Sequence, residues 1–246
     1  MAEHKFPTEV IDLPSKGKLY PKEHPCSNGK IEIKYMTAKE EDILTSQNLI
    51  KKGIVIDKLL NSLIVTNGVK CEDLIIGDKN AVMVAARILA YGPEYTCEVT
   101  TPNGDTLEQT FNLADCPFRH IDEKHTENLF ECELPISKKK IKYKLLTGKD
   151  ETQITKDLEA SRKVGVSVSP ELTTRLRYLI KEVDGDNSKA VINDFAMNML
   201  SRDSMFLREE MKNMSPDIIL EQEVEIGGES VKVDIPMTVG FFWPNT

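Results

Sequence analysis

The stretch Ile31-Glu32-Ile33-Lys34-Tyr35-Met36-Thr37-Ala38-Lys39-Glu40 changes from the pattern of a strand to that of a helix. Residues 31–35 alternate apolar and polar side chains, as a half-buried strand does. Residues 37–40 form a capping box, because the Thr37 hydroxyl can accept from the amide three residues later while the Glu40 carboxylate reaches back. This stretch therefore predicts a strand followed at once by a helix, which we expect to end before Gly53.

Helices and strands alternate on the carboxyl side of this stretch. Apolar residues at helical spacing indicate helices, and period-two patterns on either side of turn residues indicate hairpins. We expect helices over 55–64, from a cap at Asp78 to Gly92, and over 150–162, 170–182, 188–199 and 202–213. We expect strands over 95–99, 107–111, 130–134, 141–145, 220–226 and 231–235, with turns at Pro102-Asn103-Gly104-Asp105 and Gly227-Gly228.

The first thirty residues contain four prolines, a density that excludes a long helix and favours an extended arm. We therefore predict an α+β fold with short helices in two clusters, antiparallel β-hairpins and an extended amino-terminal arm. The expected parts are a Pro-rich arm at 1–30, helices followed by β-hairpins at 31–147, and a helical cluster with a carboxy-terminal β-hairpin and aromatic tail at 148–246.

Composition excludes several classes of protein. The 246 residues are 40% hydrophobic and 29% charged, which is typical of a globular chain. Polar residues interrupt the longest apolar run, 54–64, so we expect a soluble protein with no membrane partner. Forty acidic against 32 basic residues give a net charge of −8, which disfavours nucleic acid. Five cysteines without paired spacing, and no leader pattern at the amino terminus, indicate a reducing cytoplasm.

Catalytic motifs are missing from the sequence. Neither GxxxxGK[ST], GxGxxG nor GxSxG occurs, so we expect no catalytic residues and no cofactor. Cys116, His120 and His125, with Cys97 and Cys132 nearby in the sequence, carry the thiolate and imidazole groups that zinc prefers. No CxxC pair accompanies them, so we expect no bound metal. A zinc site or a metal-dependent enzyme at Cys116, His120 and His125 is the alternative.

Three further segments have more than one interpretation. Lys138–Lys144 holds five lysines in seven residues, and is either a solvated loop running into a strand edge or a contact for nucleic acid or an acidic partner. Methionines concentrate in the last two helices, where they fill the core or form an adaptable surface. The aromatic end Phe241-Phe242-Trp243-Pro244 must be covered, either by this chain or by another.

Four stretches of the sequence share a likeness to one known family. These stretches are Leu13–Pro21 in the arm, Ile33–Ser46 at the strand-to-helix step, Lys144–Glu151 at a second such step, and Asp203–Arg208 together with Phe241-Phe242-Trp243-Pro244 near the end. They resemble the baseplate hub assembly proteins of contractile bacteriophages of the T4 type, and the second and last stretches are the most specific.

The resemblance implies a non-enzymatic protein that helps to build the baseplate hub, either as a subunit or as an assembly chaperone. Its expected partners are other hub proteins or the tape-measure protein, with a homo-oligomer as a further option. Its expected location is the host cell cytoplasm during assembly, and the tail baseplate if it is retained in the virion. We expect the arm, the last helix and the tail to bind these partners, through Leu19, Tyr20, Met205, Phe206, Phe241, Phe242 and Trp243.

Overall fold

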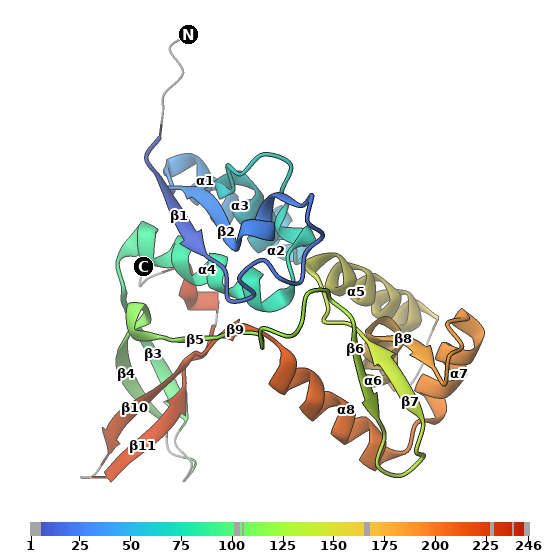
Figure 1. Ribbon diagram of the computed structural model, residues 1–246. Coiled ribbons are helices and arrows are strands. Elements are labelled where there is room, and N and C mark those ends of the chain that lie inside the picture. Colours follow the sequence, from blue (N-terminus) through green and yellow to red (C-terminus); the bar gives the residue numbers. More distant parts are fainter. Residues whose placement is uncertain are drawn as a thin grey trace.

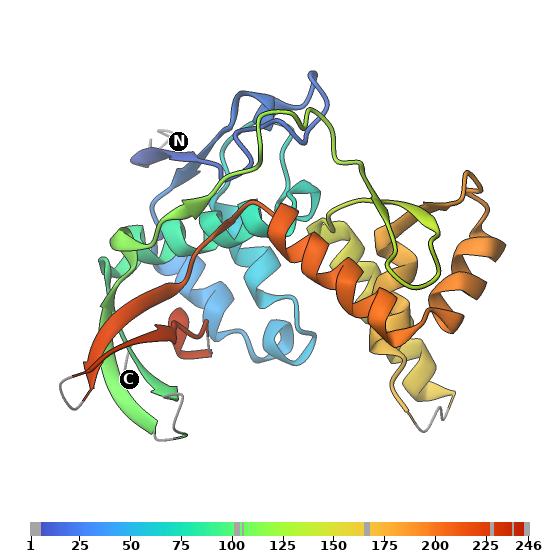
Figure 2. The same ribbon diagram turned by 60° about the horizontal axis from the view of Figure 1, so that its bottom comes forward.

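The computed structural model describes residues 6–100, 104, 106–164, 168–226, 229–237 and 239–243. Within these ranges the chain forms eight α-helices and eleven strands, and every strand pairing is antiparallel. The α+β fold predicted from the sequence is confirmed. The elements gather into two groups (Figures 1 and 2), which are joined by an antiparallel bridge between Ile75 and Thr147. We call residues 6–119 and 215–243 the first lobe, and residues 120–214 the second lobe.

Four helices form the centre of the first lobe: α1 (Ala38–Thr45), α2 (Gln47–Lys51), α3 (Val55–Leu63) and α4 (Ile76–Tyr91). The predicted capping box is present, because the Glu40 carboxylate accepts from the Thr37 amide and hydroxyl. The one helix predicted before Gly53 is two helices, since Ser46 has an extended backbone (φ −67°, ψ 101°) that ends α1.

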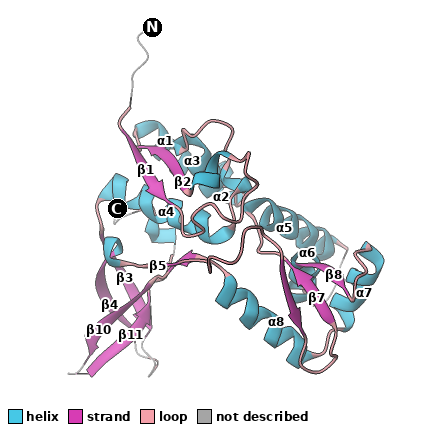
Figure 3. Ribbon diagram, viewed as in Figure 1, coloured by secondary structure: helices cyan, strands magenta, loops and turns pink. Residues whose placement is uncertain are grey.

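Three two-stranded ribbons surround these helices: β1 (Thr8–Asp12) with β2 (Lys30–Lys34), β3 (Glu94–Thr100) with β4 (Thr106–Asn112), and β10 (Glu221–Ile226) with β11 (Glu229–Asp234). Strand β1 was not predicted, because the arm that contains it had been expected to be extended without a strand partner. The β3–β4 and β10–β11 hairpins lie side by side (Figure 3). Apart from Gly104, their two predicted turns lie outside the described residues.

The second lobe packs helices against one three-stranded sheet. The strands are β6 (Phe130–Glu133), β7 (Lys140–Tyr143) and β8 (Ile180–Val183), and the helices are α5 (Gly148–Lys163), α6 (Glu171–Leu179), α7 (Lys189–Asn198) and α8 (Ser201–Met214). The prediction of a helix to residue 182 was wrong. Ile180 and Val183 are buried, and the segment between them pairs with β7. Such pairing with a distant strand overrides local helical spacing.

Two short strands join the lobes. β5 (Phe118–Arg119) leads out of the first lobe, β9 (Asp217–Ile218) leads back into it, and the two pair antiparallel. The carboxy-terminal hairpin consequently lies in the first lobe, where β11 contacts β3, whereas the predicted division at residue 148 groups it with α5–α8. Sequence order could not reveal this, because the hairpin returns across a segment of about one hundred residues to reach its neighbour.

The amino-terminal arm crosses the start of α4 and is fixed there by a buried carboxylate. Asp78 accepts from the Ser15 amide (2.9 Å) and hydroxyl (2.6 Å), and from the Tyr20 hydroxyl (2.7 Å). Asp78 had been predicted to cap α4, but Ile75 is the N-cap residue. Short 3₁₀ turns complete the chain at Pro25–Asn28, Cys71–Asp73, Leu113–Asp115 and Val239–Phe241. The buried apolar side chains form one cluster that continues from the first lobe into the second.

Candidate partner-binding surface

The far end of the second lobe is built where α7 meets α8. Only Met199 and Leu200 separate the two helices, and both have extended backbones (φ −61° and −62°, ψ 132° and 140°). The chain therefore turns sharply without a glycine. In both views α7 lies at the opposite end of the molecule from the paired hairpins (Figures 1 and 2).

Asp203 fixes this end of the lobe. Its side chain is fully buried in the first turn of α8, and its two oxygens accept from the amides of Ile136 (2.8 Å) and Ser137 (3.0 Å) in the β6–β7 turn. Burial alone would raise the pKa of Asp203, but these hydrogen bonds outweigh it and hold the pKa below its ordinary value. The β6–β7 turn is thereby held against α8.

A shallow groove of about 540 Å³ lies beside this anchor. The apolar face of α7 forms one wall, and residues of the β6–β7 turn and of the α7–α8 link complete it. Its lining includes Val183, Val191, Phe195, Met199 and Leu200. The lining also includes the polar residues Ser137, Lys139, Asp194, Asn198 and Asp203, so the groove combines apolar contact area with hydrogen-bonding groups.

Large apolar side chains remain exposed in the same segments. Ile136 is 42% exposed, Met197 71%, Leu200 50% and Met205 51%. We call these four residues, of which Leu200 lines the groove, together with the groove itself, the tip surface. Exposed apolar side chains that gather beside an apolar groove are candidates for contact with another macromolecule, whereas single exposed apolar residues are common on protein surfaces. Methionine suits such a site because its unbranched side chain adapts to partners of different shape.

The seven residues predicted to bind partners have different environments. Leu19, Tyr20, Phe241 and Phe242 are buried against the core of the chain itself. The arm packs on α4, and Phe241 packs edge-on against Tyr95 of β3 at 5.1 Å between ring centres. Trp243 and Phe206 are partly buried against the same core. Met205 alone is in the exposed class, and it belongs to the tip surface.

Sequence reasoning missed Leu200 and Ile136. Leu200 was included in no predicted helix, and Ile136 was assigned to a loop. The spacing of α8 does reveal the exposure of Met205. The buried face of this helix contains Asp203, Ser204 and Leu207. Met205 lies off that face at 3.6 residues per turn, which marks it as apolar and outward-facing.

The alternative zinc site does not assemble. The Cys116 Sγ accepts from the Gln222 side chain, His120 Nδ1 lies 2.9 Å from the Pro14 carbonyl, and His125 packs against Phe130. Among the described residues, the one group of three candidate metal ligands within reach of each other is Asp57, Cys71 and Glu72. Cys116, His120 and His125 are therefore not a common ligand set.

The Asp57, Cys71 and Glu72 group is satisfied by neighbouring protein atoms. Asp57 pairs with Lys79 at 2.5 Å, and Glu72 accepts from the Asn61 side chain at 2.9 Å. Burial raises the pKa of the Cys71 thiol well above its ordinary value, which leaves the thiol protonated and unreactive. This group is explained as a link between α3, α4 and the 3₁₀ turn at residues 71–73.

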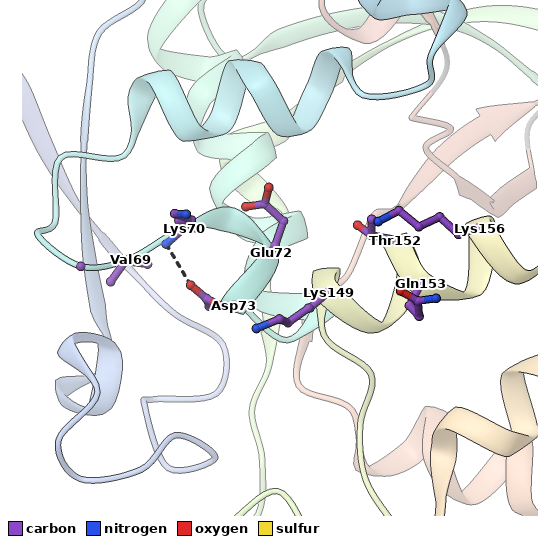
Figure 4. Close-up of a pocket in the computed structure, with 9 residues that line it drawn as sticks. Val69, Lys70, Glu72, Asp73, Lys149, Thr152, Gln153 and Lys156 are labelled. Carbon is purple, nitrogen blue, oxygen red and sulfur yellow. Dashed lines mark hydrogen bonds between the residues drawn. The ribbon is translucent and has the colours of Figure 1, made fainter.

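A polar cleft of about 600 Å³ lies between that 3₁₀ turn and the start of α5 (Figure 4). Lys149 and Lys156 of α5 line one side, and Lys70, Glu72 and Asp73 at the 3₁₀ turn line the other (Figure 4). Because both charge signs are present, the cleft has no strong preference for anions or cations.

Most of the lysines in the segment Lys138–Lys144 form ion pairs. Lys139 pairs with Asp184, Lys142 with Glu182 and Lys144 with Asp150, at 2.6–2.8 Å. The expectation that this segment runs into a sheet edge was wrong, since β7 is the central strand of its sheet. The acidic neighbours reduce the local positive charge that a phosphate backbone would need.

No protein-family model, curated protein or solved structure matches this chain. Within the described ranges, no helix combines the length and apolar character that crossing a bilayer requires. The geometry of the tip surface is therefore the main structural guide to function.

Proposed function

We propose that this chain is a non-enzymatic assembly protein that helps to build the baseplate hub of a contractile bacteriophage tail. It acts by binding other proteins, as a hub subunit or as an assembly chaperone. The observation that carries this proposal is the tip surface, where Ile136, Met197, Leu200 and Met205 are exposed beside an apolar groove.

The sequence resemblance supplies the class of partner. The stretch Asp203–Arg208, one of those that resemble the hub assembly proteins, contains both the anchor of the tip surface and Met205. The stretch Leu13–Pro21 instead holds the arm on α4. Under this proposal, one stretch serves partner binding while the other stabilises the fold. The partners are other hub proteins or the tape-measure protein.

Binding at the tip surface proceeds by removing apolar area from water. A fully buried Leu or Met side chain contributes about 1.5–3 kcal/mol relative to its exposed state. A hub protein with a complementary apolar face is thereby protected from non-specific aggregation until the ring closes. The protein acts in the host cytoplasm during assembly, with later retention in the baseplate if it is a hub subunit.

Co-expression with the hub and tape-measure proteins of the same phage tests this proposal. We expect one of them to co-purify with the wild-type chain, and Leu200→Asp and Met205→Asp to weaken that binding about tenfold or more. Ile50→Asp is the matched control, because Ile50 is 40% exposed on the first lobe. Equal binding by all four proteins, or no co-purification with the wild type, would contradict the proposal.

Retention in the particle is tested separately by mass spectrometry of mature virions and of assembly intermediates. A subunit is present in both, whereas a chaperone is present only in the intermediates. If the chain is absent from both, it is neither a hub subunit nor a hub assembly chaperone, and that part of the proposal is contradicted.

A further inference from the structure

One edge of the β1–β2 ribbon has no partner among the described residues. β2 pairs with β1 on one side and approaches Ile64 on the other, while β1 pairs with β2 alone. In both ribbon views β1 lies at the outside of the first lobe, with no described helix or strand beyond it (Figures 1 and 2). Val10, in the middle of β1, is 55% exposed.

The hydrogen-bond phase determines which backbone groups this edge presents. Tyr35 donates to the Pro7 carbonyl and Leu13 donates to the Gly29 carbonyl, at the two ends of the ribbon. Hydrogen-bonded pairs alternate in an antiparallel ladder, so Glu9 and Ile11 bond inward to β2. The N–H and C=O groups of Thr8, Val10 and Asp12 therefore point outward, and all three residues are exposed.

Natural edge strands are protected by short length, charged side chains (lysine above all), a bulge or a proline. β1 has two acidic side chains, Glu9 and Asp12, but no bulge, lysine or proline over Thr8–Asp12. The edge is regular and open to another extended strand.

We infer that β1 is a self-association edge, at which β1 of a second copy of this chain pairs antiparallel about a two-fold axis through Val10. The ribbons β1–β2 of the two copies thereby become one four-stranded sheet. This inference is independent of the tip surface and of the proposed function.

Symmetry selects this register. With Val10 opposite Val10 of the second copy, Thr8 lies opposite Asp12 and all three outward-facing residues form hydrogen-bonded pairs. The interface is isologous, as a closed dimer requires. A register centred on Glu9 or on Ile11 leaves only two of the three outward residues paired within the strand.

The charges of β1 favour the same register. Glu9 lies opposite the partly buried Ile11 of the second copy, so no two like charges face each other. A register centred on Glu9 places two glutamates directly opposite, which is destabilising. Asp12 is already paired with Lys30 at 3.1 Å, and it gains the Thr8 hydroxyl of the second copy as a neighbour.

The first test measures molar mass by sedimentation velocity over a range of concentrations. We expect the wild-type mass to rise from one chain toward two. Val10→Pro removes the outward N–H at the two-fold axis and should remain a monomer, because proline is tolerated where an edge-strand N–H faces solvent. Val10→Thr keeps the N–H and the β-branched shape, and should dimerise as the wild type does. Thermal unfolding of both variants checks that the fold is retained.

The second test reads the register by disulfide trapping under mild oxidation with diamide. Hydrogen-bonded antiparallel pairs have Cα atoms about 5.5 Å apart, within the range of a disulfide. Val10→Cys should therefore cross-link to itself, whereas Thr8→Cys residues would be about 14 Å apart and should not. The wild type controls for the native cysteines. A monomeric wild type at every concentration, or equal trapping of both variants, would overturn the inference.

Discussion

Tyr20 and Asp78 are joined by a buried hydrogen bond of 2.7 Å across 58 residues of sequence. The same Tyr20 oxygen accepts from the Ile75 amide at 3.1 Å, one residue before α4 begins. Burial raises the pKa of Asp78, although the hydrogen bonds from Ser15 and Tyr20 act in the opposite direction. The arm is therefore part of the fold and stabilises the start of the longest helix of the first lobe.

Tyr20→Phe should destabilise the protein by about 1–3 kcal/mol, because it leaves the buried Ile75 amide unsatisfied and removes a donor to Asp78. Urea unfolding measures this loss. Tyr178→Phe is the matched control, since Tyr178 donates to Asp157 from a partly exposed position and should lose less. If the two variants are equally stable, the arm is not held by this bond.

Glu40 should make the free energy of unfolding depend on pH in the acid range. Burial would raise the pKa of Glu40, but hydrogen bonds from Lys34, Thr37 and Ser62 outweigh it and lower the pKa from 4.5 to about 2. A carboxyl with a depressed pKa in the folded state stabilises the fold above its unfolded pKa. This contribution is lost as the pH falls from about 5 to about 2.

Glu40→Gln should therefore cost about 1–3 kcal/mol at neutral pH and flatten the loss of stability in that acid window. Urea unfolding as a function of pH measures both effects. The exposed neighbour variant Glu41→Gln should retain the wild-type pH dependence. An unchanged acid profile for Glu40→Gln would show that other carboxyls control this window.

Gly77 permits a close approach between α4 and the strand that returns from the second lobe. A Cβ at this position would lie 1.8 Å from the Pro216 carbonyl oxygen, which belongs to the backbone and cannot rotate away. Gly77→Ala should cost about 3 kcal/mol or more despite the better helix propensity of alanine. Thermal or urea unfolding measures this change in the free energy of unfolding.

Gly53→Ala is the comparison for Gly77→Ala. Gly53 has a left-handed backbone (φ +65°) but open space around it, so alanine should cost only about 1 kcal/mol. A smaller loss for Gly77→Ala than for Gly53→Ala would mean that the contact with Pro216 is easily relaxed.

The cysteines should react slowly in the folded protein. Burial raises the pKa of Cys26 and of Cys132 to about 11, and raises the pKa of Cys116 despite a hydrogen bond from Gln222. At about pH 8 these thiols are mostly protonated and should be alkylated by iodoacetamide far more slowly than in urea. Mass spectrometry of labelled peptides measures each rate. Fast selective labelling of Cys116 would restore the case for a reactive site.

Local signals accounted for most of the helices. The Thr37 and Glu40 capping box could be predicted because its partners are three residues apart. β1 and β8 were missed because each depends on a partner strand distant in sequence. Asp78 was predicted to be a helix cap because of its position before a helix. Its carboxylate instead accepts hydrogen bonds from Ser15 and Tyr20, which are more than fifty residues away in the sequence.

The candidate surface was only partly predictable for the same reason. Met205 was predicted as a binding residue, but Leu19 and Tyr20 have a similar apolar character and are buried. Which apolar side chains are covered depends on how the arm packs on α4. Leu200 of the α7–α8 link and Ser137 of the β6–β7 turn line one groove, because Asp203 holds that turn against α8.

The pairing of Arg119 with Asp217 gives the molecule a modular character. Polypeptide enters and leaves the second lobe at a single point, in the manner of a domain inserted into a host. A two-residue hairpin turn between these partners would bypass residues 120–216 and leave every other strand pairing of the host intact. The second lobe could thus have been gained, exchanged or lost while the first lobe kept its own architecture.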